Sequence, residues 1–152
     1  MSPLFSSSWA RSWIGLDARG DGASVRDAVL GKYAEAHRRY HTTQHLAECL
    51  SLFESVQHAA DHPHEVEMAL WFHDAVYDLD SAGNEERSAS WAKAALIEAG
   101  VDRDSAARVH DLRPGTLAVA ALFSIVTHAV APISLRVLAH HASRAARAGN
   151  AT

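Results

Sequence analysis

The chain lacks most features that mark secreted, membrane or nucleic-acid-binding proteins. Among its 152 residues there is one cysteine, Cys49, so no internal disulfide can form and a disulfide-held secreted fold does not fit. No apolar run is long enough to cross a bilayer. A net charge of −4 argues against the clustered basic surface that nucleic-acid polymers require. We therefore expect a cytoplasmic protein that binds neither a membrane nor a nucleic-acid polymer.

Acidic residues are missing from the last part of the chain. All eighteen lie at or before Asp111, so the first part carries about −8 and residues 112–152 carry +4. This tail has no lysine, eleven alanines and one aromatic residue, Phe123. We divide the chain into a helical domain at residues 1–111 and an atypical Ala/Arg/His-rich segment at residues 112–152.

Apolar residues recur at helical spacing through the first part, and no segment alternates long enough for a confident strand. Glycines make residues 15–23 a loop, and residues 61–64 form another. The stretch that follows the second loop has almost no polar side and should lie at the centre of the fold. The fold class is therefore all-α, a compact helical bundle. Five helices are predicted, from a Ser24 cap to about Ala36, from Thr42 or Thr43 to about Val56, from about Glu65 to Tyr77, from an Asn84 cap to Gly100, and from about Asp102 to Leu112.

Histidines provide the one sign of chemistry. His41 and His45 are four residues apart and would share one helical face if the helix already includes His41, and His73-Asp74 lies inside an apolar run. Polar groups buried there need partners, and imidazole together with carboxylate suits divalent ions. The alternative to a metal site is that His45 and His73 are core histidines whose nitrogens are satisfied by hydrogen bonds. We interpret Cys49, on the inward face with His45, as core packing, and the second pair, His110-Asp111, as surface residues.

Four stretches follow one another in an order and spacing that resemble the HD superfamily of metal-dependent phosphohydrolases. The likeness is greatest to a bacterial branch of small HD-domain proteins of unassigned substrate, and it covers about residues 9–111. The matching stretches are Tyr33-Ala34-Glu35, His37 to His45, Ala69 to Asp78 and Asn84 to Ala89.

The resemblance implies an HD-domain-like helical core with one divalent metal ion (Mn, Fe, Co, Mg, Ni or Zn). His45, His73 and Asp74 would be its ligands in this chain. The string from Tyr40 to His45 also resembles the Tyr-His-Asn-x-x-His signature of cyclic nucleotide phosphodiesterases, in which the first histidine is the general acid. By that similarity His41 would protonate a leaving oxygen of a small phosphorylated metabolite or nucleotide.

Three further residues have two interpretations each. Arg38 could bind substrate phosphate, because guanidinium suits that geometry, or could be a solvated surface arginine. Glu85 could assist as a base or substrate contact, or could only complement the start of a helix. Asn84 could contact substrate, although we expect it to cap that helix.

The chain departs from the family pattern after residue 111. The family continues with an Asp-x-Asp-Leu helix that supplies the last metal carboxylate, and no acidic residue follows Asp111 here. Either the tail is a natural divergence, with His128, His140 or His141 as a substitute ligand, or it is a shifted reading frame, which we favour. We expect loose metal binding, lower stability than in family relatives and impaired hydrolysis. The alternatives are a catalytically inactive HD-like domain that binds a nucleotide or protein partner, and a purely structural helical domain.

Overall fold

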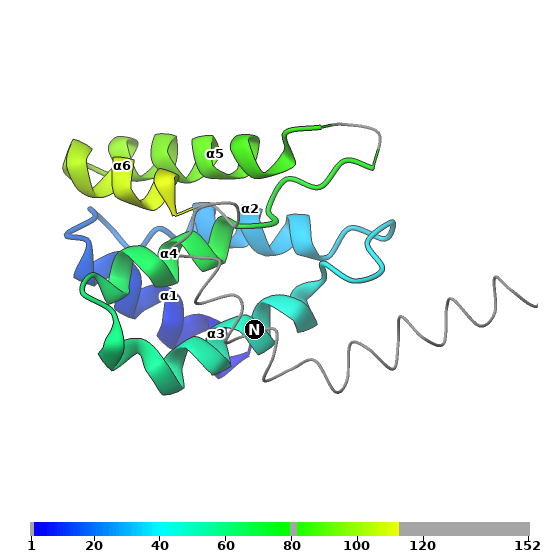
Figure 1. Ribbon diagram of the computed structural model, residues 1–152, viewed down its shortest axis with the longest axis horizontal. Coiled ribbons are helices and arrows are strands. Elements are labelled where there is room, and N and C mark those ends of the chain that lie inside the picture. Colours follow the sequence, from blue (N-terminus) through cyan, green and yellow to red (C-terminus); the bar gives the residue numbers. More distant parts are fainter. Residues whose placement is uncertain (1, 80–81, 113–152) are drawn as a thin grey trace, which may run out of the picture.

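The computed structural model describes residues 2–79 and 82–112, and this part of the chain is all-α, as predicted (Figure 1). It contains no strand, and none of its helices is long and apolar enough to cross a membrane. The elements are α1 (Pro3–Gly15), α2 (Ala23–Tyr33), α3 (Thr43–Val56), the 3-10 turn η1 (Gln57–Ala59), α4 (Pro63–Phe72), α5 (Asn84–Glu98) and α6 (Arg103–Asp111).

Helix α4 lies at the centre of the bundle, as its apolar sequence predicts. It packs against α1 and α3 on one side and against the paired helices α5 and α6 on the other (Figure 1). Met68, Leu70, Trp71 and Phe72 are all buried. Burial on this scale is the main favourable contribution to folding, so α4 is the element around which the other helices are arranged.

Helix α1 was not predicted, although Phe5, Trp9 and Trp13 recur every four residues; four serines lie between them. Pro3 occupies the first turn, where its missing N–H costs nothing. Trp9 and Trp13 stack on each other with ring centroids 5.1 Å apart, and Trp9 meets Trp71 of α4 edge-on at 5.0 Å. Aromatic pairs in these geometries add to the burial of their surface, so the aromatic face of α1 holds the helix against α4.

Two predicted helix starts are wrong. Helix α2 begins at Ala23 rather than after a Ser24 cap, because the Asp21 carboxylate accepts the Ala23 N–H at 3.0 Å. Helix α5 is preceded by Gly83, which takes a left-handed conformation with φ of 89°, so Asn84 is inside the helix and is not its cap. The predicted start of α6 is correct: the Asp102 side chain accepts the N–H groups of Asp104 and Ser105.

The largest difference concerns the end of α4. The pattern predicts a helix to Tyr77, but the helix ends at Phe72 and His73 is its C-terminal cap. The Asp74 N–H donates to the Tyr33 hydroxyl at 3.1 Å instead of continuing the helical ladder. The carbonyl oxygens of Asp74 and Ala75 accept hydrogen bonds from Arg38. Partners outside the helix therefore draw the chain away from the helical path at this point.

A buried carboxylate joins α1 to α4. The Glu67 side chain is 1% exposed and accepts hydrogen bonds from the Ser8 hydroxyl at 2.7 Å and from the Arg11 guanidinium. The Trp71 indole N–H donates to the same Ser8 hydroxyl at 2.9 Å. A buried charge is tolerable only when it is paired and hydrogen-bonded, so this group of four side chains depends on Arg11.

We expect Arg11→Ala to lower the free energy of unfolding by about 1–3 kcal/mol, because Glu67 would stay buried without its counter-charge. Urea denaturation followed by circular dichroism measures the change. Lys32→Ala is the matched control, since the Lys32 ion pair with Glu35 is half-exposed and should contribute little. An Arg11→Ala midpoint equal to that of the control would show that Glu67 does not need this arginine.

Candidate metal centre

Three segments bring four polar side chains together. His45 is in the first turn of α3, His41 lies in the turn that precedes α3, and His73 and Asp74 follow the last residue of α4. Helix α3 begins at Thr43, as predicted, so it does not include His41 and the condition for a shared helical face is not met. The turn nevertheless brings the His41 and His45 rings together, with centroids 5.5 Å apart.

The donor atoms of His45, His73 and Asp74 converge. His73 Nε2 lies 3.2 Å from His45 Nε2 and 2.9 Å from Asp74 Oδ2, and His45 Nε2 lies 3.7 Å from the same oxygen. Bonds of about 2.1 Å to one ion separate neighbouring ligand atoms by about 3.0 Å in octahedral and about 3.4 Å in tetrahedral geometry. The three separations fall around these values, so the residues present fit a single divalent ion.

Hydrogen bonds on the far side of the His73 ring set its orientation. Nδ1 lies 2.6 Å from the Leu70 carbonyl oxygen and 3.3 Å from the Tyr33 hydroxyl. Because a carbonyl oxygen only accepts, we assign a proton to Nδ1. Metal-binding histidines are commonly held in this way, with the second nitrogen donating to a carbonyl. The arrangement directs Nε2 toward His45 and Asp74.

Burial and mutual charge control the protonation of the cluster. Burial, together with the positive charge of His73, lowers the pKa of His45 to about 4, which leaves this ring neutral at physiological pH. Burial would raise the pKa of Asp74, but His73 and the hydrogen bond from His41 keep it well below its ordinary value. Burial would likewise lower the pKa of His73, but the Asp74 carboxylate raises it. The Asp74 charge therefore favours a positive species here, either a proton on His73 or a metal ion.

The cluster opens toward solvent on the side of His41. Side-chain exposure rises from 3% at His73 to 13% at His45, 17% at Asp74 and 28% at His41. His41 Nδ1 contacts Asp74 Oδ2 at 2.5 Å, which leaves Nε2 on the opposite side of the ring. A small molecule would thus reach His41 before it reaches the ligand atoms of His73.

Arg38 is inside the fold rather than on its surface. Its side chain is 0% exposed and donates to the carbonyl oxygens of His41, Asp74 and Ala75 at 3.3, 2.6 and 2.9 Å. The interpretation as a solvated surface arginine is therefore wrong. These bonds join the turn that carries His41 to the turn that carries His73 and Asp74. Phosphate binding by Arg38 stays a prediction, and it would compete with these bonds.

Asn84 and Glu85 occupy different positions relative to the cluster. The Asn84 side chain accepts the Asp78 N–H at 3.2 Å and donates to the Asp78 carbonyl at 2.8 Å, so it fixes the loop before α5. Glu85 lines a small cavity together with His73 and Ala69. The structure thus brings Glu85 to the side of the cluster, whereas the hydrogen bonds of Asn84 are to the loop.

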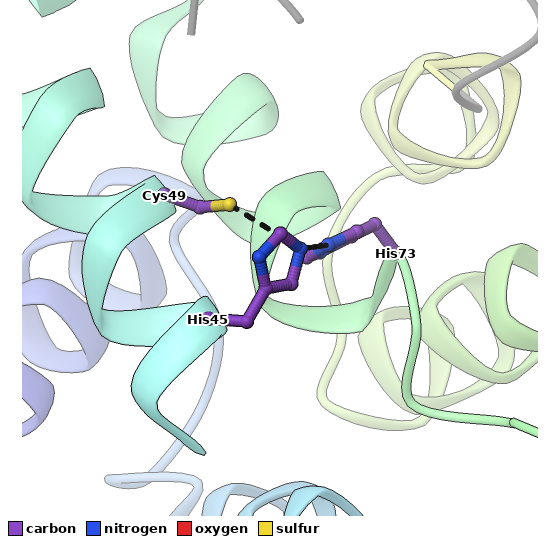
Figure 2. A group of neighbouring side chains, drawn as sticks. All are labelled: His45, Cys49 and His73. Atoms are coloured by element: carbon purple, nitrogen blue, oxygen red, sulfur yellow. Dashed lines mark hydrogen bonds between the residues drawn. The ribbon is translucent and has the colours of Figure 1, made fainter. Parts of the chain in front are cut away.

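Sequence reasoning assigned no chemistry to two neighbours of the cluster, Tyr33 and Cys49. Cys49 is buried, as predicted, but its Sγ lies 3.7 Å from His45 Nε2 (Figure 2). Burial raises the pKa of its thiol to about 12. The spacing of four residues from His45 was the available signal, because it places both side chains on the same face of α3.

The second His-Asp pair, His110-Asp111, lies outside the cluster. His110 contacts Glu86 at 3.1 Å and Asp111 at 2.9 Å, and its side chain is 17% exposed, so it is more buried than a plain surface residue. Asp111 is 72% exposed, as expected. His128, His140 and His141, the substitute ligands considered above, lie outside the described residues, as does the whole atypical segment after Leu112.

Comparison with known proteins adds no relative to this picture: no protein-family model, curated protein or solved structure matches the chain. The resemblance to the HD superfamily therefore stays a prediction from the four sequence stretches.

We expect Arg38→Ala to reduce the free energy of unfolding by about 2–4 kcal/mol, because three backbone acceptors would lose their donor in a buried position. Chemical denaturation of this variant, beside the neighbouring and exposed Arg39→Ala, measures the effect. Arg39→Ala should behave like the unchanged chain. If the two variants were equally stable, the guanidinium of Arg38 would be available for a ligand.

Proposed function

We propose that this chain is a metal-dependent phosphohydrolase of the HD type that acts on a small phosphorylated metabolite or nucleotide. One observation carries the proposal: donor atoms of His45, His73 and Asp74, from two separate segments, converge within 3.7 Å of one another. A core that only needed to satisfy two histidines would not require a charged carboxylate between them, because an ionised group is expensive to bury.

His45, His73 and Asp74 would hold one divalent ion. When bound, such an ion offsets charge on phosphoryl oxygens and lowers the pKa of water. The two imidazoles and one carboxylate are compatible with Mn, Fe, Co, Mg, Ni or Zn. Tyr33 would support the centre, since its hydroxyl contacts both His73 Nδ1 and the Asp74 N–H.

His41 is the residue we assign to proton transfer. Its Nδ1 is oriented by Asp74, so Nε2, on the more open side of the cluster, could donate a proton to a leaving oxygen. Imidazole suits this task because it exchanges protons near neutral pH. Glu85, which lines the cavity beside His73, would assist as a base or a contact to substrate.

An open pocket beside the cluster supports a small substrate. Tyr77 lines it, and the Tyr77 ring lies 4.8 Å from the His41 ring, measured between centroids. Lys32 and Arg87 also line the pocket and could contact phosphate groups. Glu35 and Asp78 line it too, 2.9 Å from Lys32 and 3.8 Å from Arg87, and they match this positive charge. A pocket of mixed charge suits a small molecule, whereas a nucleic-acid polymer would need a continuous basic surface.

The lack of acidic residues after Asp111 favours a second candidate function. Without the carboxylate that the family uses as its last ligand, the domain could bind a nucleotide or a protein partner without turnover. Binding of a nucleoside monophosphate to the metal-loaded chain, with no product formed, would select this function over hydrolysis.

We expect Asp74→Asn to weaken binding of Mn²⁺ or Zn²⁺ at least about 10-fold, since even removal of the hydrogen-bond partners of metal ligands costs about 10–100-fold. Isothermal titration calorimetry of the apo chain measures the affinity. Asp111→Asn is a matched control, because it changes the same residue type after the same neighbour in the second His-Asp pair. Equal affinities in the two variants would contradict a centre built on Asp74.

We expect His41→Gln to slow hydrolysis of an alkyl phosphate, such as a nucleoside monophosphate, by about 10²–10⁴-fold. Both reactions are measured at saturating metal, because His41 hydrogen-bonds the proposed ligand Asp74 and its loss should also weaken metal binding. Hydrolysis of p-nitrophenyl phosphate should slow much less, because nitrophenolate leaves without the help of an acid. Steady-state kinetics on both substrates test the assignment, with His58→Gln, an exposed histidine just beyond α3, as the control. A similar loss on both substrates would assign His41 to binding instead.

A further inference from the structure

We infer that the thiolate of Cys49 is a further ligand of the ion held by His45 and His73, and that the centre selects a thiophilic ion such as Zn²⁺. This inference rests on the metal centre proposed above. It adds a ligand that neither the sequence pattern nor the family resemblance supplies.

The position of the sulfur carries the inference. Cys49 Sγ lies 3.7 Å from His45 Nε2, and one donor atom from each of His45, Cys49 and His73 lies within 4.8 Å of the others. Zinc bonds of about 2.3 Å to sulfur and about 2.1 Å to nitrogen place these two atoms about 3.6 Å apart in a tetrahedron. The observed separation therefore matches that of two ligands on one zinc ion.

Figure 2 shows how the three side chains reach the same point. His45 and Cys49 extend from successive turns of α3, and His73 enters from the end of α4, with its ring directed at that of His45. The Cys49 side chain is held by a well-packed helix, since its neighbours Leu46, Leu50 and Phe53 are fully buried. The sulfur is thus fixed in position before any ion arrives.

A buried cysteine most often acts as a small apolar side chain. Cys49 differs because its sulfur faces an imidazole nitrogen instead of apolar carbon only. The same nitrogen also faces His73 Nε2 at 3.2 Å, so His45 stands between the sulfur and the second imidazole. An apolar role does not account for this contact, which in the metal-free chain has the geometry of a weak S–H···N hydrogen bond.

The chemistry of the donor set predicts which ion is preferred. Thiolate and imidazole together select Zn²⁺ or Co²⁺ over Mg²⁺, which prefers oxygen ligands. On coordination the Cys49 thiol would release its proton to solvent, so each ion bound through sulfur would free one proton. Cys49 would then replace the carboxylate that the chain lacks after Asp111.

Cobalt titration of the full-length apo chain tests the inference. Cys49 is the chain's one cysteine, so a thiolate-to-cobalt charge-transfer band in the near ultraviolet has a single source within the molecule. The band should rise to a plateau at one equivalent of Co²⁺. It should be lost in Cys49→Ser and in Cys49→Ala, with Co²⁺ affinity reduced at least about 10-fold. His58→Ala, an exposed histidine just beyond α3, should keep the band.

The outcomes separate this inference from the proposed function. One equivalent of Co²⁺ bound without the band would overturn Cys49 as a ligand and leave the centre of His45, His73 and Asp74 standing. No bound Co²⁺ would overturn both. A band that survived in His45→Ala would show the sulfur binding cobalt apart from this centre and would also overturn the inference. Because the band is read in the unchanged chain, the result holds even if a cysteine variant fails to fold.

Discussion

The centre depends on how the chain leaves α4. Tyr33 takes the Asp74 N–H and Arg38 takes the next two carbonyl oxygens, so the backbone turns away where a helix would otherwise continue. In a continued helix, His73 and Asp74 would project about 100° apart around the axis, because successive residues share no face. The turn allows His73 Nε2 and Asp74 Oδ2 to approach within 2.9 Å. A hydrogen-bonding constraint on the backbone thus creates the charge pair.

The same fold separates structural polar groups from those available for chemistry. Glu67 is deeply buried, but its oxygens are taken by Ser8 and Arg11. Asp74 is also largely buried, yet its neighbours are the imidazoles of His41 and His73, which can lose a proton and make room for a metal cation beside the carboxylate. This difference in partners, together with the greater exposure of Asp74, makes Asp74 the better candidate for binding a ligand.

Sequence patterns predicted the helical class and the central position of α4, because both depend on local periodicity. The role of His45, His73 and Asp74 as ligands came from the family resemblance and stays a prediction. The end of α4 could not be predicted, since no proline or glycine interrupts residues 73–77 and the competing hydrogen bonds come from Tyr33 and Arg38, about forty residues earlier. Arg38 looked like a surface residue for the same reason: its acceptors are distant in sequence. The proximity of Cys49 to the second imidazole likewise required the packing of α3 on α4.

Arg38 has one more consequence. Its hydrogen bonds to three carbonyl oxygens join the turn before α3, which carries His41, to the turn after α4, which carries Asp74. Neither turn is part of a helix, whereas Trp9 and Trp71, which pack against each other, belong to helices α1 and α4. Warming should therefore loosen the cluster while the helices persist, so a probe of the His41 and Asp74 side chains would show a lower melting point than the helical scaffold.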